Sequence, residues 1–158
     1  MKLYTTLSEE TVFIGVSAPD KTTLLQELVR RMTEVYSCPD PDQLIEIILE
    51  REAEISTGIG GGVAIPHANQ APVEETMLAA ATLASPLEYN AIDGQPVQLI
   101  FLVMTGSGKA GLHLKILARI SRMSHKEELL QKLIDSTTPA EFLQHLSSFE
   151  DRFTDMST

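Results

Sequence analysis

One histidine lies in a sequence context suited to phosphoryl transfer. His67 follows Pro66 directly and comes after a loop that holds four glycines and two hydroxyl residues. A neutral imidazole nitrogen is a good nucleophile, and glycines let backbone N–H groups converge on an anion. We therefore predict that the loop binds phosphate through Ser56, Thr57, Gly58, Gly60, Gly61 and Gly62.

Two further side chains fit an anion site around His67. Arg51 lies just upstream and offers a planar cation suited to phosphate, although an arginine there would also fit the last carbonyls of a helix. His113 falls in the first turn of a helix that follows a second glycine-containing loop, residues 105–111. A helix N-terminus favours an anion and disfavours a protonated imidazole.

Two nucleotide-binding motifs are only partly present. The string GSGKAG at residues 106–111 resembles a phosphate-binding loop, but Val103 and Ala110 replace its required glycine and hydroxyl residue. The string GIGGGV at residues 58–63 resembles a dinucleotide fingerprint, but Val63 replaces the third glycine and a helix precedes it. We expect neither nucleotide binding nor any other cofactor.

Metal and thiol chemistry have little support in the sequence. No His-Glu-x-x-His pair or Cys-His cluster is present. A zinc site built from His67 and His113 stays open, without a pattern that favours it. Cys38 lies in a proline-rich break with no cationic neighbour, so we interpret it as a structural or incidental cysteine.

Composition favours a cytoplasmic globular protein. The chain has 158 residues and a formal net charge of −10, which opposes binding to nucleic acid. Its longest apolar runs, such as residues 97–104, are too short to span a bilayer, and its N-terminus lacks a signal-peptide core. An acidic surface can steer a basic protein partner, or it can serve solubility alone.

Apolar periodicity and turn residues divide the first two thirds of the chain into helices and strands. We expect a strand over 11–16, a helix from Asp20 to about residue 36, and a second helix that Asp40 caps and that ends near residues 51–54. Short strand 63–65 follows the glycine loop. Longer strands cover 77–84 and 97–104, with a turn at Asp93-Gly94 between them.

The last third of the chain is predicted to be helical. Helices are expected over 112–123, 125–135 and 139–149, the second capped by Ser124 with Glu127 and the third by Thr138 with Glu141. We assign residues 1–150 to one domain and 151–158 to a polar C-terminal tail. Strands interrupted by helices predict an α/β fold with helices covering a central sheet.

The strings around the two histidines resemble one protein family. Arg51-Glu52 followed by TGIGGGVAIPH (57–67) resembles the phosphorylation-site signature of enzyme IIA of the bacterial sugar phosphotransferase system, in the fructose/mannitol class that includes the nitrogen-regulatory branch. DGQPVQLIFLVM (93–104) resembles the central strand of that family, and HLKILARIS (113–121) resembles its second-histidine helix. Ala68 replaces the glycine that usually follows the signature histidine.

The resemblance implies a fold, a chemistry and partners. It implies a single-domain α/β sandwich with a mixed, roughly five-stranded sheet flanked by helices. His67 would be the phosphorylated nucleophile, with Arg51 and His113 as its site partners and no metal. The donor would be phospho-HPr, and the acceptor an enzyme IIB cysteine or a regulatory target protein. The length of the chain favours the nitrogen-regulatory branch; the alternative is a component of fructose/mannitol-type sugar uptake.

Overall fold

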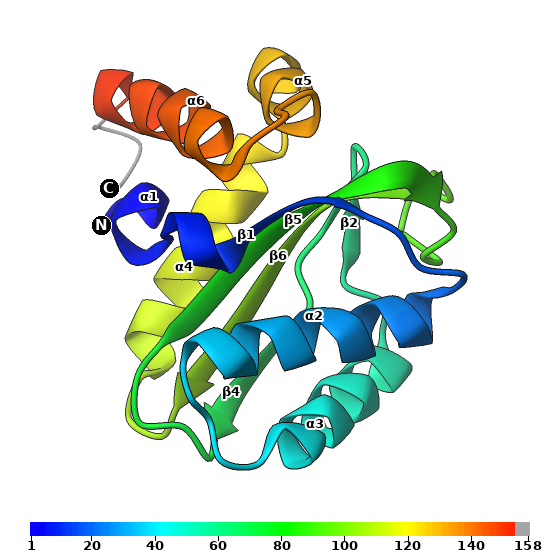
Figure 1. The fold of residues 1–158 in the computed structure, drawn as a ribbon, viewed down its shortest axis with the longest axis vertical. Coiled ribbons are helices and arrows are strands. Elements are labelled where there is room, and N and C mark those ends of the chain that lie inside the picture. The colour runs from blue at the N-terminus through cyan, green and yellow to red at the C-terminus, as the bar shows by residue number, and fades with distance from the viewer. Residues whose placement is uncertain (154–158) are drawn as a thin grey trace.

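A computed structural model describes residues 1–153 and shows one mixed sheet between two layers of helices (Figure 1). The strands are β1 (Val12–Val16), β2 (Gly58–Gly60), β3 (Val63–Ala64), β4 (His67–Ala71), β5 (Met77–Leu87) and β6 (Val97–Gly106). The helices are α1 (Leu3–Thr6), α2 (Lys21–Val35), α3 (Pro41–Glu54), α4 (Ala110–Met123), α5 (Glu127–Ile134) and α6 (Pro139–Arg152), with a 3-10 turn at Glu9–Thr11.

The two longest apolar runs form the centre of the sheet. β5 and β6 pair antiparallel, and the strand order is β1-β5-β6-β3-β2 with β4 also paired to β6. Residues 77–84 and 97–104 are thus confirmed as central strands, and Gly94 turns the chain between them with a positive φ of 71°. The predicted α/β sandwich is confirmed.

The sheet has six strands because Pro66 divides one of the expected five. Val63 pairs with Leu99 and His67 pairs with Val103, an offset of 36 residues in both cases (99 − 63 and 103 − 67). β3 and β4 therefore form one interrupted line beside β6. Pro66 has no N–H to donate, but its carbonyl still accepts from the N–H of Val103 at 3.0 Å. His67 consequently begins a strand, where the sequence had predicted that it follows the end of one.

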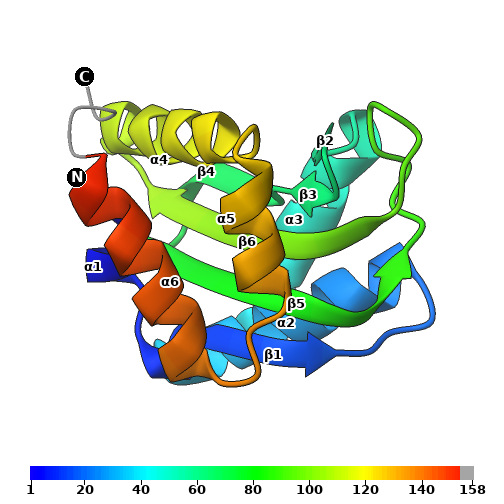
Figure 2. The ribbon, with the colours of Figure 1, turned by 90° about the horizontal axis from the view of Figure 1, so that it is seen from above.

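Alternate residues of β6 face opposite layers of helices. One row packs with α2 and α3, and the other packs with α1, α4, α5 and α6 (Figure 2). The first row comprises Ile100, Leu102 and Met104, and the second comprises Leu99, Phe101 and Val103. β6 is buried on both faces, which explains its continuous apolar sequence.

Side-chain caps start three of the helices as predicted. Asp20 accepts from the N–H of Thr23 at the start of α2, and Asp40 accepts from the N–H of Gln43 at the start of α3. Thr138 does the same for α6. Each cap satisfies an N–H that has no partner within its helix.

The cap predicted for the second C-terminal helix is wrong. α5 begins at Glu127 with Lys126 at its N-cap position and no side-chain cap. The hydroxyl of Ser124 instead donates to the carbonyl of Ser121, because Ser124 still belongs to the end of α4. The pattern of a hydroxyl and an acid three residues apart therefore occurred here without the helix start that it usually marks.

The end of the chain differs from the predicted boundary. α6 continues to Arg152, and Asp151 accepts from Lys2 at 2.6 Å and from the hydroxyl of Tyr4 at 2.7 Å. The predicted tail of residues 151–158 thus begins inside a helix that contacts the N-terminus, and its residues 154–158 lie outside the described part. None of the helices described is long and apolar enough to cross a membrane.

Candidate functional site

The candidate site lies at the edge of the sheet, beside β4. β2 pairs with β3 but not with β4, so the outer side of β4 stays uncovered by another strand. α3 reaches this edge from one face of the sheet and α4 from the other (Figure 2). A cavity of about 290 Å³ opens there. It is lined by Ile47, Arg51, His67, Ala68, Asn69, His113, Leu114 and Leu117.

The backbone fixes the tautomer of His67. Its Nδ1 lies 2.7 Å from the carbonyl oxygen of Ile65. A carbonyl oxygen can only accept, so Nδ1 carries the proton and Nε2 keeps its lone pair. Nε2 lies 3.4 Å from Nη2 of Arg51 and lines the cavity side of the ring. The structure thus leaves Nε2 as the ring nitrogen with a lone pair, beside Arg51.

Burial keeps the His67 ring neutral. Burial and the nearby charge of Arg51 lower the pKa of His67 below its ordinary value, although the hydrogen bond to Ile65 acts in the opposite direction. A neutral imidazole is the form that can attack phosphorus. The environment of His67 therefore favours the reactive form at neutral pH.

His113 faces His67 from the buried side of α4. The two rings lie 5.4 Å apart between centroids with an interplanar angle of 55°. Nδ1 of His113 lies 2.8 Å from the hydroxyl oxygen of Thr105, which is fully buried. Burial, followed by the neighbouring His67 ring and the charge of Arg51, lowers the pKa of His113. His113 is therefore also neutral at pH 7.

Arg51 fits both interpretations that its position in the sequence allowed. Its Nη1 donates to the carbonyl of Ile55 at 3.3 Å, at the end of α3, while Nη2 faces His67. The bond to the helix end holds the guanidinium in place, and the second amino group stays available to the cavity. The structure thus brings together Arg51, His67 and His113 from three separate elements.

The structure does not bring the glycine-rich loop to this cavity. Ser56 donates its hydroxyl to the carbonyl of Tyr89, and Thr57 donates both its N–H and its hydroxyl to the buried Glu52. Most of the predicted loop forms the β2–β3 hairpin. None of the residues predicted to bind phosphate lines the cavity, namely Ser56, Thr57, Gly58, Gly60, Gly61 and Gly62.

The far end of the hairpin lies well away from the histidines. Gly61 approaches the carbonyl of Ser124, which follows the C-terminal end of α4, and its N–H donates to Asp93. His113 lies in the first turn of this 14-residue helix, and a helix of that length spans about 20 Å. The four glycines shape a tight hairpin, with three of them at positive φ and Gly58 in close packing, and their binding of phosphate stays a prediction.

Sequence reasoning missed two kinds of site residue. Thr105 went unnoticed because it ends an apolar strand and lies eight residues before His113, a spacing with no local meaning. The apolar rim of the cavity, Leu114 with Leu117 and Ile47, was detectable in principle. Leu114 and Leu117 are three residues apart on α4, and Ile47 lies four residues before Arg51 on α3, so each pair shares a helix face.

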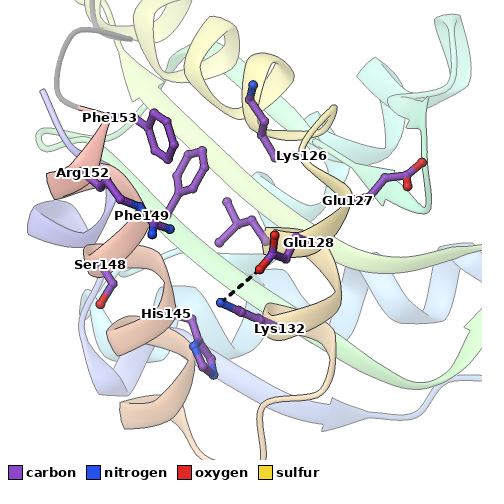
Figure 3. Close-up of a pocket in the computed structure, with 10 residues that line it drawn as sticks. Lys126, Glu127, Glu128, Lys132, His145, Ser148, Phe149, Arg152 and Phe153 are labelled. Carbon is purple, nitrogen blue, oxygen red and sulfur yellow. Dashed lines mark ion pairs between the residues drawn. The ribbon is translucent and has the colours of Figure 1, made fainter.

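A second cavity, of about 270 Å³, lies between α5 and α6 (Figure 3). Leu129, Phe149 and Phe153 form its apolar part, and Lys132 pairs with Glu128 at 3.7 Å on its rim. None of the residues that line this second cavity lines the cavity beside His67. Within residues 1–153, no group of His, Cys, Asp or Glu side chains is placed to hold a metal ion.

Comparison with known proteins finds similarity along most of the chain. Residues 5–149 match the family model described as phosphoenolpyruvate-dependent sugar phosphotransferase system, EIIA 2. The chain is 33% identical over 127 residues to a nitrogen regulatory protein of Bradyrhizobium diazoefficiens, covering 80% of this chain and 82% of that protein. It is also 32% identical over 136 residues to the fructose-specific EIIABC component of Bacillus subtilis, covering 86% of this chain.

The matched lengths differ between these relatives. The chain spans 21% of the length of the Bacillus protein, so it corresponds to one part of that larger polypeptide. Among solved structures, the nitrogen regulatory protein IIA-Ntr of Neisseria meningitidis superimposes with a TM-score of 0.84 at 26% identity, over 91% of this chain and 98% of that one. The fold therefore matches that of this IIA-Ntr protein over most of both chains.

Proposed function

The chain belongs to the phosphoenolpyruvate-dependent sugar phosphotransferase system EIIA type-2 family, and from that premise we propose that Nε2 of His67 accepts and releases a phosphoryl group. Membership implies a transferase-type role in phosphoryl transfer. One observation carries the assignment of the atom: the Ile65 carbonyl holds the proton on Nδ1 and leaves Nε2 free beside Arg51. The proposed donor is a phosphohistidine protein of the HPr type.

The proposed reaction exchanges one nitrogen–phosphorus bond for another. The bond to the donor histidine breaks while the bond to Nε2 of His67 forms, in line and through a loose transition state. His67 becomes positively charged as its lone pair is used, and the Nδ1–H bond to Ile65 stabilises that charge. The scheme requires neither a nucleotide nor a metal.

Arg51 and His113 serve the phosphoryl oxygens in this scheme. Nη2 of Arg51 leaves Nε2 of His67 as the phosphorus approaches and binds an equatorial oxygen with a charge-assisted hydrogen bond. His113 donates a hydrogen bond from the opposite side of the cavity. The transferred group is then held by a cation and a neutral donor, while Nε2 alone bonds to phosphorus.

Two downstream roles fit this chemistry. In the favoured role the chain acts as a nitrogen-regulatory-type IIA protein, whose phosphorylation controls binding to target proteins; the 33% identical relative that carries this name supports it. In the second role the chain passes the phosphoryl group to a cysteine of an enzyme IIB in fructose/mannitol-type sugar uptake. The 32% identity to a fructose-specific EIIABC component supports the second.

Mass spectrometry after incubation with phospho-HPr tests the assignment of His67. We expect one acid-labile, alkali-stable phosphoryl group on His67 of the wild-type chain and none on His67→Gln. His125→Gln serves as the control, because His125 is exposed and lies outside the cavity. Undiminished labelling of His67→Gln would remove His67 from the reaction. A label found on His113 would exchange the roles of the two histidines.

A further inference from the structure

We propose that Thr105 is a positioning residue, whose hydroxyl donates to Nδ1 of His113 and so makes Nε2–H of that neutral ring a donor to the phosphoryl group on His67. The inference rests on the proposed function of His67. It assigns to Thr105 a part in the reaction that does not involve contact with the phosphoryl group.

Thr105 belongs to a row of β6 residues whose other members are apolar. The β6 residues that face α4 alternate as Leu99, Phe101 and Val103, and Thr105 is the next in the row. It is fully buried, with 0% of its surface exposed. Valine has the same shape and would continue the row. A buried hydroxyl costs free energy unless it is hydrogen-bonded, and the partner of this one is Nδ1 of His113 at 2.8 Å.

The two histidines are held by different kinds of group. Nδ1 of His67 faces a carbonyl, which can only accept, so its tautomer is fixed. Nδ1 of His113 faces a hydroxyl, which can either accept or donate by rotating. A hydroxyl therefore permits the tautomer in which Nε2 of His113 carries the proton, whereas a carbonyl in the same place would exclude it.

Phosphoryl oxygens accept hydrogen bonds and cannot donate them. A neutral His113 can serve them only from Nε2–H, which leaves Nδ1 as a lone pair in a buried position. The Thr105 hydroxyl satisfies that lone pair. The ring stays neutral in this arrangement, because its one proton is on Nε2 and the hydroxyl is the donor to Nδ1. Burial lowers the pKa of His113, so the alternative of protonating the ring is disfavoured.

Three variants separate this role from simple packing. Thr105→Val keeps the shape and removes the hydroxyl, and Thr105→Ser restores the hydroxyl. Thr82→Val is the matched control, because Thr82 is 2% exposed on the neighbouring strand β5 and its hydroxyl accepts from the N–H of Gly15. Rates of His67 labelling by phospho-HPr, and the lifetime of the phosphorylated form, are measured for each.

We expect Thr105→Val to lower the labelling rate and the lifetime by about fivefold, the effect of one neutral hydrogen bond. Thr105→Ser should restore both to within about twofold, and Thr82→Val should leave both near the wild-type values even if it unfolds at a lower temperature. A wild-type rate and lifetime for a folded Thr105→Val, with His67 still labelled, would overturn the inference and leave the proposed function intact. Absence of label on wild-type His67 would overturn the proposed function itself.

Nitrogen-15 NMR of the imidazoles gives a readout that packing alone would not change. In the phosphorylated wild-type chain we expect the proton of His113 on Nε2 and a hydrogen-bonded lone pair on Nδ1. In Thr105→Val the Nδ1 resonance should shift to that of a nitrogen without a donor. Finding the proton on Nδ1 of His113 in the phosphorylated wild type would show that Thr105 only accepts, and would overturn the inference.

Discussion

Arg51 bonds two different acceptors, and this division predicts how its substitution acts. The Ile55 carbonyl holds Nη1, while Nη2 faces Nε2 of His67. We expect Arg51→Ala to slow labelling of His67 by roughly 10- to 150-fold, because a hydrogen bond from a charged group contributes about 1.5–3 kcal/mol.

Arg51→Lys should restore only part of the labelling rate. A lysine ammonium lacks the planar guanidinium, whose two amino groups can bond the helix carbonyl and the phosphoryl group at the same time. Stopped-flow or quenched labelling with phospho-HPr measures the rates. Arg122→Ala is the control, because Arg122 is exposed in the last turn of α4. An Arg51→Ala rate equal to that of Arg122→Ala would show that Arg51 only ends its helix.

The buried imidazoles predict a specific dependence on pH. The folded protein lowers the pKa of both His67 and His113, so below about pH 6.5 the unfolded chain binds more protons than the folded one. Their contribution to the free energy of unfolding is therefore fully present above that pH and is lost as the pH falls below it. Labelling of His67 should likewise stay constant from pH 7.5 to 6.5.

NMR titration of the two histidine rings measures their pKa values directly. Urea unfolding at several pH values measures how the free energy of unfolding depends on pH. His67→Gln should flatten the loss of stability below pH 6.5. A pKa of His67 at or above its ordinary value would contradict the expectation and would weaken the case for a neutral nucleophile.

At the scale of elements, a buried carboxylate joins the end of α3 to the strand that follows it. Glu52 accepts from the N–H and hydroxyl of Thr57, from the hydroxyl of Tyr89, and from Lys21 at 2.8 Å. Burial acts to raise the pKa of Glu52, but the bonds from Lys21 and Thr57 outweigh it and lower the pKa. The network fixes the end of the helix that carries Arg51.

Glu52→Gln should therefore lower the free energy of unfolding by about 3 kcal/mol, because Lys21 loses its charged partner and a buried amide cannot accept all these bonds. The labelling rate should fall as well, through displacement of Arg51. Glu54→Gln, an exposed change two residues away, is the control for both measurements. A stability loss no larger than that of Glu54→Gln would mean that packing, rather than the carboxylate, holds this corner.

The turn from β6 to α4 depends on the absence of a side chain at Gly106. A Cβ built there would overlap the carbonyl oxygen of Val73, a backbone atom that cannot move aside alone. We expect Gly106→Ala to destabilise the fold by about 1–3 kcal/mol and to slow labelling, because β4 and β6 must separate near His67.

Gly111→Ala is the matched control in the next element. A Cβ at Gly111 meets no atom within 4 Å, and the residue lies in the first turn of α4. Alanine there should leave stability unchanged or raise it by up to about 1 kcal/mol. Thermal unfolding of the two variants compares them; equal melting temperatures would contradict the steric argument.

Local signals predicted most elements and missed the ones that depend on distant partners. Asp20, Asp40 and Thr138 mark helix starts because a cap is a contact between near neighbours. β4 was missed because its sequence, HANQA, is not apolar and forms a strand only by pairing with β6. β2 was missed for the same reason, since its glycines suggest a loop until its pairing with β3, which was predicted, is seen.

For the molecule as a whole, the site combines three elements that lie far apart in the sequence. His67, Arg51 and His113 were predicted because the family resemblance grouped them, and the structure places them around one cavity. The glycine-rich loop was predicted to bind phosphate from its nearness to His67 in the sequence, but none of the predicted loop residues lines the cavity, because Pro66 and β3 intervene. Thr105 emerged only from the sheet register and burial.

Phosphorylation should act on the whole molecule as a binding switch. The chain already carries a formal net charge of −10, and a phosphoryl group brings roughly two negative charges into the cavity, of which the positive His67 ring offsets one. That charge would appear inside an apolar rim, where Leu114 is 66% exposed beside Leu117 and Ile47. A target that covers this rim without a cation of its own would bury the part of the charge that Arg51 and the His67 ring leave uncompensated, and a cost of only about 1.4 kcal/mol already lowers affinity tenfold.

The test is a comparison of binding between chain phosphorylated on His67 and the His67→Ala variant, which cannot carry the charge. Regulatory action predicts a target that binds His67→Ala at least about tenfold more tightly than the phosphorylated chain. Leu114→Asp should abolish that binding in both forms, because it places a charge on the rim without altering the histidines, and His125→Gln should leave it unchanged.

A sugar-uptake role predicts the reverse: an enzyme IIB would bind the phosphorylated chain, place a cysteine thiolate in line with the phosphorus, and remove the label from His67 while sugar phosphate accumulates. Rapid loss of label to a IIB cysteine would therefore overturn the regulatory role and leave His67 as the carrier of the phosphoryl group.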